Sequence, residues 1–168
     1  MATNRVLVLA PHTDDGELGC GGTIAKWCDA GNDVFYVAFS TAEQSVPEGF
    51  PKDILKTEVR LATEVLGIKN ENLIIMNYEV RKLNYSRQSI LEDLVSIKRD
   101  VKPDTVFIPC MDDIHQDHST VAHEALRAFK STTMLSYELI WNNISFNTHS
   151  FVVLDEEHII RKARALKQ

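Results

Sequence analysis

Short apolar runs alternate along the chain with longer stretches in which apolar residues recur at helical spacing. The short, β-branched runs predict buried strands at residues 5–10, 33–40, 73–76 and 105–109. Apolar positions three and four residues apart predict helices at residues 21–30, 52–66, 87–99 and 119–129. Gly31 and Gly67 stand where helices commonly end. Two further strands are expected at 134–140 and 151–154, and a last helix from 156 to the end of the chain.

This order of elements predicts the fold class. Four successive strand–helix units favour an α/β fold with a mainly parallel sheet and helices on both faces. We find no internal repeat, linker or low-complexity tract, so residues 1–168 are expected to form one domain.

Composition narrows the classes of partner. The formal net charge of −6 argues against a nucleic-acid or anionic-membrane surface, which would need clustered Lys and Arg. No run approaches the roughly 20 apolar residues of a membrane span. The chain opens on a strand pattern rather than a secretory signal, and its three scattered cysteines suit a reducing compartment. We therefore expect a cytoplasmic protein; the sequence leaves a homo-oligomer open.

Two polar loops follow predicted strands. The first, His12-Thr13-Asp14-Asp15, comes directly after the strand at 5–10 and leads into four glycines, which we interpret as a turn. The second runs from Asp112 to His118 after the strand at 105–109. Because open α/β sheets place their chemistry at the carboxyl ends of the strands, both loops are expected to converge on one site.

The residue types in these loops suggest metal-assisted hydrolysis. Two His and one carboxylate form the usual three-ligand catalytic zinc site, which leaves a position for water. A further carboxylate can take the proton of that water, and a further His can donate to an oxyanion. A dinucleotide site is disfavoured, because the glycines are not spaced as G-x-G-x-x-G and the second strand ends in Ser40-Thr41 rather than an acidic residue.

The two loops resemble the motifs of the LmbE-like (PIG-L) family of zinc-dependent N-acetylglucosamine (GlcNAc) de-N-acetylases. That family's motifs are Ala-His-Pro-Asp-Asp-Glu with a downstream Gly-Gly, and His-x-Asp-His. Here they are matched by residues 11–16 with Gly21-Gly22, and by residues 115–118. Weaker similarity extends over residues 5–167. The resemblance implies a Rossmann-like fold and hydrolysis of the acetamide of a GlcNAc-containing small molecule or glycoconjugate, with release of acetate.

The resemblance also implies a role for each motif residue. The metal ligands would be His12, Asp15 and His118, and Asp14 would be the general base. The ion would be Zn²⁺, although such a site also accepts Fe²⁺ or Co²⁺.

The remaining two motif residues would act on the oxyanion that forms from the attacked acetamide carbonyl. His115 would stabilise it, and Asp117 would orient His115.

The chain departs from the family pattern near the substrate. Thr13 replaces a Pro, Gly16 replaces a Glu that recurs as Glu17, and Leu55 stands where many members carry an Arg. Substrate contacts are therefore expected from other residues, for which we name Arg81, Arg87 and Glu138. The polar loop 41–51 is a candidate lid, and we expect a carboxyl end that is shorter than in most members.

Two other functions stay open at this point. One is a different amidase on the same scaffold, such as a thiol-conjugate amidase. The other is a noncatalytic sugar- or nucleotide-binding module with a structural metal.

Overall fold

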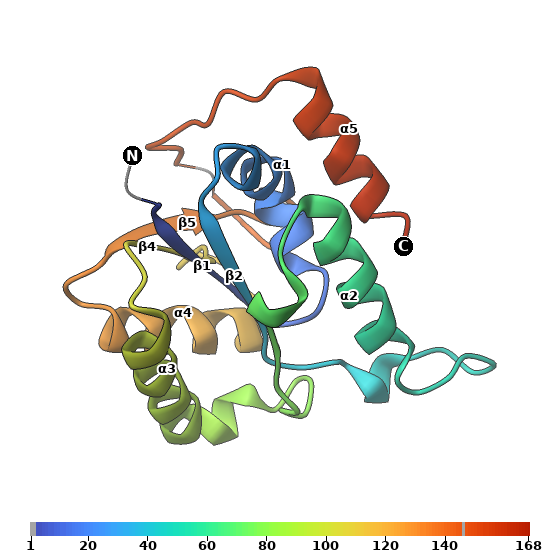
Figure 1. Ribbon diagram of the computed structural model, residues 1–168. Helices are drawn as coiled ribbons and strands as arrows, with labels where there is room; N and C mark the ends of the chain where they lie inside the picture. The colour runs from blue at the N-terminus through green and yellow to red at the C-terminus, as the bar shows by residue number, and fades with distance from the viewer. Residues whose placement is uncertain (1–2, 146) are drawn as a thin grey trace.

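The computed structural model describes residues 3–145 and 147–168. Within them, five strands form one sheet in the order β3-β2-β1-β4-β5, and every neighbouring pair is parallel (Figure 1). The strands are β1 (Arg5–Ala10), β2 (Asp33–Ala38), β3 (Leu73–Ile75), β4 (Thr105–Pro109) and β5 (Thr133–Tyr137). The predicted α/β fold with a parallel sheet is thus confirmed.

Helices cover both faces of the sheet. They are α1 (Asp15–Asp29), α2 (Ile54–Leu66), α3 (Arg87–Val101), α4 (Gln116–Ala128) and α5 (Glu156–Ala165). Helices α1, α2 and α5 pack together on one face, and α3 and α4 pack together on the other (Figure 1). Three short 3₁₀ helices, η1 (Glu43–Ser45), η2 (Asn70–Asn72) and η3 (Leu83–Ser86), lie in the connections.

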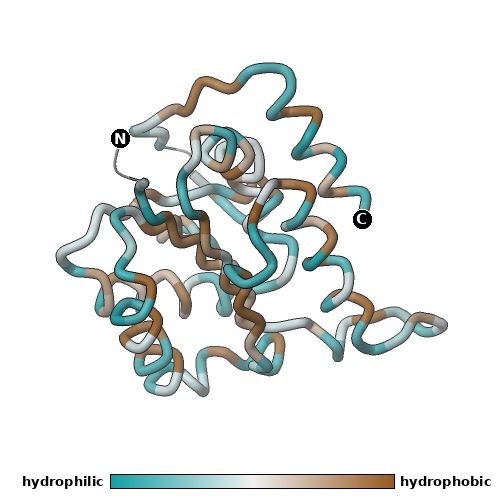
Figure 2. The backbone as a smooth tube through the Cα atoms, in the orientation of Figure 1, coloured by the Kyte–Doolittle hydropathy of each residue, from teal (hydrophilic) through white to brown (hydrophobic). Residues whose placement is uncertain are grey.

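The central strand explains why the strand segments are apolar throughout. Val6, Val8 and Ala10 of β1 enter the core beneath α1 and α2, whereas Leu7 and Leu9 enter the core beneath α3 and α4. Because successive side chains point to opposite faces and both faces are covered, β1 needs apolar residues at every position from Val6 to Ala10. Figure 2 shows this apolar band at the centre of the molecule.

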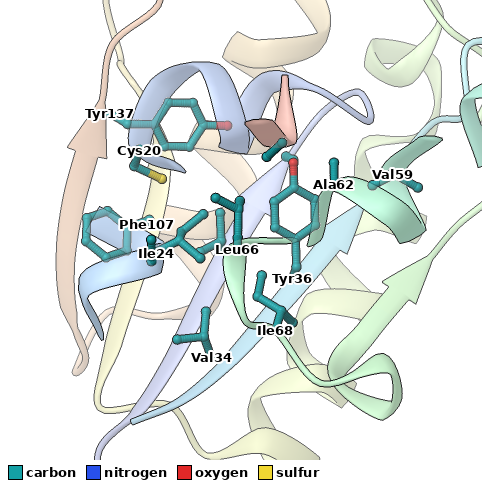
Figure 3. Packing of buried hydrophobic residues seen from close by; sticks show 14 of the residues in the cluster. Cys20, Ile24, Val34, Tyr36, Val59, Ala62, Leu66, Ile68, Phe107 and Tyr137 are labelled. Atoms are coloured by element: carbon teal, nitrogen blue, oxygen red, sulfur yellow. The ribbon is translucent and has the colours of Figure 1, made fainter. Parts of the chain in front are cut away.

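Helix α1 begins at Asp15, six residues before the predicted start at residue 21. The glycines that we expected to form a turn lie inside this helix, so that prediction was wrong. A Cβ atom at Gly16 would clash with the ring of Tyr36, and one at Gly19 would clash with the ring of Tyr137. Both rings are buried beneath α1 (Figure 3). The glycines therefore let α1 lie close to the sheet.

Helix α4 also begins earlier than predicted. It starts at Gln116 rather than at residue 119, because the side chain of His115 caps it by accepting a hydrogen bond from the N–H of Asp117. The polar residues of the second motif therefore lie in the first helical turn rather than in a loop.

The predicted strand at 151–154 is absent. These residues pair with no strand, and Phe151 and Val153 are exposed. Apolar composition alone does not create a strand, because strand propensity depends strongly on packing context.

Strand β5 ends at Tyr137, three residues before its predicted end. The chain then turns through a hydrogen bond from the N–H of Asn142 to the carbonyl of Leu139.

No helix in the described part of the chain is long and apolar enough to cross a membrane.

The packing of α1 makes a prediction about Gly19. Gly19→Ala should lower the free energy of unfolding by about 1–3 kcal/mol, because overpacking against Tyr137 outweighs the better helix propensity of Ala. Urea unfolding would measure the change. In a Tyr137→Leu background the same substitution should cost clearly less; an equal cost in both backgrounds would contradict the clash.

Candidate metal centre

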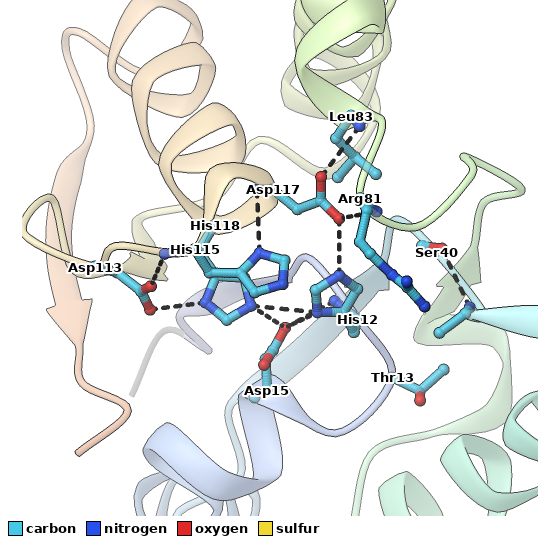
Figure 4. Close-up of polar contacts among 12 residues, drawn as sticks. His12, Thr13, Asp15, Ser40, Arg81, Leu83, Asp113, His115, Asp117 and His118 are labelled. Atoms are coloured by element: carbon cyan, nitrogen blue, oxygen red, sulfur yellow. Dashed lines mark hydrogen bonds and ion pairs between the residues drawn. The ribbon is translucent and has the colours of Figure 1, made fainter. Parts of the chain in front are cut away.

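The two polar motifs meet at the carboxyl ends of the neighbouring strands β1 and β4 (Figure 4). His12 follows β1, and Asp15 is the first residue of α1. His118 lies in the first turn of α4, which follows β4. The short crossing from each strand into its helix brings side chains more than 100 residues apart into direct contact.

Three polar atoms form a compact triangle at this point. His12 Nδ1 lies 3.2 Å from Asp15 Oδ2, His118 Nε2 lies 3.2 Å from the same oxygen, and the two nitrogens are 3.2 Å apart. His115 lies beside them, its ring stacked on that of His118 with 4.5 Å between centroids. His12, His115 and His118 offer nitrogen atoms within 4.8 Å of one another, a spacing that could hold a metal ion.

Carboxylates behind the two imidazoles set which nitrogen faces the triangle. Asp117 Oδ2 lies 3.0 Å from His12 Nε2, and Asp113 Oδ2 lies 2.7 Å from His118 Nδ1. A neutral imidazole donates its one proton to such a carboxylate and leaves the other nitrogen with a free lone pair. The lone pairs of His12 Nδ1 and His118 Nε2 are thereby directed at the oxygen of Asp15.

This donor set fits a divalent ion. Ligand atoms about 2.0–2.1 Å from a tetrahedral zinc ion are about 3.3–3.4 Å from one another. The 3.2 Å spacings of the triangle match this value. The two imidazoles and one carboxylate are also the ligand types of catalytic zinc sites that keep a position open. We prefer this triangle to the three-His set because its atoms lie closest together.

The histidines and carboxylates of the cluster shift one another's pKa values. Burial lowers the pKa of His12, but its hydrogen bonds to Asp117 and Asp15 outweigh burial and raise that pKa from 6.5 to about 9. For His118 the same balance, with Asp113 and Asp15 as partners, also raises the pKa to about 9. Burial raises the pKa of Asp15, yet the two histidines hold it well below its ordinary value. Without a metal ion, the carboxylates therefore favour the protonated form of His12 and His118 at pH 7.

Asp117 differs from its expected role. We expected its carboxylate to orient His115. The carboxylate is instead fully buried and accepts hydrogen bonds from His12 Nε2 and from the N–H groups of Arg81 and Leu83. These contacts outweigh burial and lower the pKa of Asp117. Asp117 therefore holds His12 in place and ties the turn after β3 to the cluster.

His115 is oriented by a backbone group. Its Nδ1 accepts a hydrogen bond of 3.2 Å from the N–H of Asp117, so in the neutral ring Nε2 carries the proton. Burial, followed by the neighbouring His118 and His12, lowers the pKa of His115. His115 is thus a neutral donor at the edge of a cavity of about 540 Å³.

Asp14 lies beside the cluster and faces this cavity. It precedes α1 and makes no capping hydrogen bond. Enclosure by the cavity walls and the charge of Asp15 raise its pKa above the ordinary value. The carboxyl group is therefore available to a molecule in the cavity.

The three expected substrate residues have different positions. Arg81 lines the cavity, and its guanidinium Nη2 donates to Ser45 Oγ over 2.7 Å. Arg87 lies elsewhere and pairs with the fully buried Glu124 of α4, with Nη2 2.6 Å from Oε1. Glu138 follows β5 and is not among the cavity residues. The structure thus brings only Arg81 to the cluster. The candidate lid 41–51 contributes Ala42 and Ser45 to the cavity wall.

Two site residues were missed from the sequence. Asp113 stands in the second polar loop, but nothing in the spacing shows that it partners His118. Glu17 is buried next to the hydroxyl of Tyr36, 3.4 Å away. Burial, followed by the charge of Asp14, raises the pKa of Glu17 to about 8. The sequence signal that could have identified Glu17 was its position two residues after the expected metal ligand Asp15.

Residues 7–129 match the model of the PIG-L family, described as GlcNAc-PI de-N-acetylase. The chain belongs to this family. Diacetylchitobiose deacetylase of Thermococcus kodakarensis is 31% identical over 111 residues, which cover 62% of this chain and only 40% of that enzyme. YaiS of Escherichia coli, an uncharacterized deacetylase, is 28% identical over 169 residues, covering 97% of this chain and 89% of its own.

Two solved structures of deacetylases have the same fold. N,N'-diacetylchitobiose deacetylase of Pyrococcus horikoshii superposes with a TM-score of 0.80 and 25% identity, covering 98% of this chain and 68% of that one. A teicoplanin deacetylase superposes with a TM-score of 0.81 at 15% identity, covering 98% and 83% of the two chains, and shows the fold alone. The diacetylchitobiose deacetylases and YaiS, to which this chain is similar at 25–31% identity, are thus named as deacetylases.

The contact between Asp113 and His118 makes a prediction about metal affinity. Asp113→Asn should weaken zinc binding by about 10–100-fold, because it removes the charge that directs the His118 lone pair inward. Competition with a chromophoric chelator would measure it. Asp112→Asn, at the exposed neighbouring position, is the matched control and should bind zinc normally. Equal affinity in the two variants would contradict the role of Asp113.

The raised pKa values of His12 and His118, about 9 each, predict a pH dependence. Zinc must displace these protons at pH 7, so its affinity should rise up to pH 9 by up to about tenfold per pH unit for each proton. The same protons stabilise the metal-free fold fully below pH 6.5, and this contribution is lost as the pH rises through about 9. Calorimetric titration at several pH values would measure the zinc affinity, and urea unfolding of chelator-treated protein would measure the stability of the metal-free fold. A zinc affinity independent of pH would exclude the displacement of protons by zinc.

Proposed function

We propose that this PIG-L chain is a zinc-dependent N-deacetylase, which hydrolyses the acetamide of a GlcNAc-containing sugar or glycoconjugate and releases acetate. The observation that carries the proposal is the triangle of His12, Asp15 and His118, with Asp14 free beside it. A structural metal site has no use for a further unpaired carboxyl group facing a cavity.

His12 Nδ1, Asp15 Oδ2 and His118 Nε2 would hold the ion. When bound, zinc supplies a Lewis acid and brings the pKa of a coordinated water from 15.7 to about 7. Fe²⁺ or Co²⁺ would suit the same ligands.

Asp14 is the proposed general base. Its position at the cavity, outside the triangle, lets it take the proton of the attacking water as the new C–O bond forms. The raised pKa of Asp14 suits a group that both accepts a proton and later returns it. The same proton can then pass to the sugar nitrogen as the C–N bond breaks, leaving acetate and an amine.

His115 is the proposed oxyanion donor. Its Nδ1 is occupied by the N–H of Asp117, which leaves the Nε2 proton to point at the carbonyl oxygen as that oxygen gains charge. The lowered pKa keeps the ring neutral, so it acts by donating a hydrogen bond rather than as a cation.

The roles of Asp14 and His115 can be separated from metal binding. Asp14→Asn should bind zinc but lose about 10²–10⁴-fold in kcat, and His115→Ala should lose about 10²–10³-fold. Acetate release from free GlcNAc, a nucleotide sugar, a glycolipid and a thiol glycoside would identify the substrate, together with metal analysis of each variant. His123→Ala, an exposed histidine on α4, is the control and should keep both properties.

Near wild-type turnover in Asp14→Asn would refute its role as base. Absence of acetate from every compound would favour a different amidase or a binding module.

A further inference from the structure

The cavity beyond the cluster has mainly apolar walls. Leu18 of α1, Leu55 and Val59 of α2, Val80 after β3 and Leu166 after α5 all line it. A volume of about 540 Å³ lies within the range of small-molecule pockets, about 300–1,000 Å³. Apolar walls of this kind suit the C–H faces of a sugar ring or another uncharged group.

The charged groups in these walls are mostly acidic. Asp14, Glu17 and Glu58 line the cavity, whereas Arg81 is the one Lys or Arg among the described lining residues. Glu58 lies on the cavity side of α2, half-buried and one helical turn from Leu55. An anionic group in the cavity would therefore face the carboxylates of Asp14 and Glu58, whereas Glu17, whose pKa is raised to about 8, carries little charge at pH 7.

A buried carboxyl oxygen of Glu17 is available to a polar group of a ligand. Glu17 is only 2% exposed, and its Oε1 has no hydrogen-bond partner among the described residues. Its other oxygen lies 3.4 Å from the hydroxyl of Tyr36. Because a buried polar atom left without a partner is costly, a hydroxyl or amine of a bound ligand is the natural partner for this oxygen.

Arg81 is already engaged. Its guanidinium donates to Ser45 Oγ, and its N–H donates to Asp117. Its backbone has a φ of 67°, so the turn that carries it is tightly constrained. One nitrogen of the Arg81 guanidinium is therefore already bound to the loop that contains η1.

We propose that the cavity selects GlcNAc compounds whose aglycone is uncharged or cationic and rich in hydrogen-bond donors, that it disfavours anionic aglycones, and that Glu58 sets this preference. The proposal rests on the deacetylase function proposed above and names its substrate class. Leu55, which stands where many family members carry an Arg, leaves the same wall without that positive charge.

Three disaccharides test the proposal. GlcNAc linked to glucosamine, to glucose or to glucuronic acid offers the same ring with a cationic, neutral or anionic aglycone. The wild-type, zinc-loaded protein should show kcat/KM and calorimetric affinity at least about tenfold lower for the glucuronic acid compound than for the glucosamine compound, because like charges repel across a partly buried site.

Substitution of Glu58 assigns the preference. Glu58→Gln keeps the shape of the side chain and should reduce the ratio between the glucosamine and glucuronic acid compounds severalfold, and Glu58→Lys should invert it. Glu64→Gln removes the same charge from an exposed position of α2 and should leave the ratio unchanged. Metal content measured in every variant identifies any loss of the cluster.

The outcomes distinguish the two proposals. Binding in the expected order without acetate release would refute deacetylase activity while supporting the aglycone preference. Equal binding of all three compounds, or an unchanged ratio in Glu58→Gln, would overturn the preference. A wild-type preference for the glucuronic acid compound that Arg81→Ala abolishes would overturn it in favour of an anion site at Arg81.

Discussion

Three atoms with lone pairs, on His12, Asp15 and His118, are held 3.2 Å apart, and the surrounding structure serves to hold them there. Such an arrangement is repulsive unless a cation or protons lie between the atoms. Asp113 and Asp117 maintain it by fixing the tautomers of the two imidazoles. The suitability of this cluster for a divalent ion therefore depends on the buried carboxylates behind the candidate ligands as much as on the candidate ligands themselves.

The position of this cluster was predictable from the sequence because parallel strands end at one edge of a sheet. An apolar run followed directly by His12 and Asp15, and another followed by His118, placed both motifs at that edge. Strand β1 is apolar at every position from Val6 to Ala10, which gives a strong signal. Helix α1 was less predictable at its start, because glycine has low helix propensity and its use here depends on Tyr36 and Tyr137 lying beneath it.

The partner that each charged side chain contacts was beyond sequence reasoning. Asp117 stands two residues from His115, yet its carboxylate contacts His12 across 105 positions. Arg87 has the charge expected of a substrate residue, but Glu124, fully buried on α4, takes it as an ion-pair partner. In each case the partner is chosen by how the helices pack, and neither spacing nor residue type carries that information.

The close packing of α1 also has an electrostatic consequence. The first N–H groups of a helix carry a partial positive charge, equivalent to about half an elementary charge at its N-terminus. Because Gly16 and Gly19 bring α1 down onto the sheet, this end of the helix is fixed at the strand edge, with Asp14 and Asp15 at its tip. The helix thus favours negative charge on Asp14 and Asp15 beside the candidate metal centre. The absence of side chains at Gly16 and Gly19 is what allows this end of the helix to lie there.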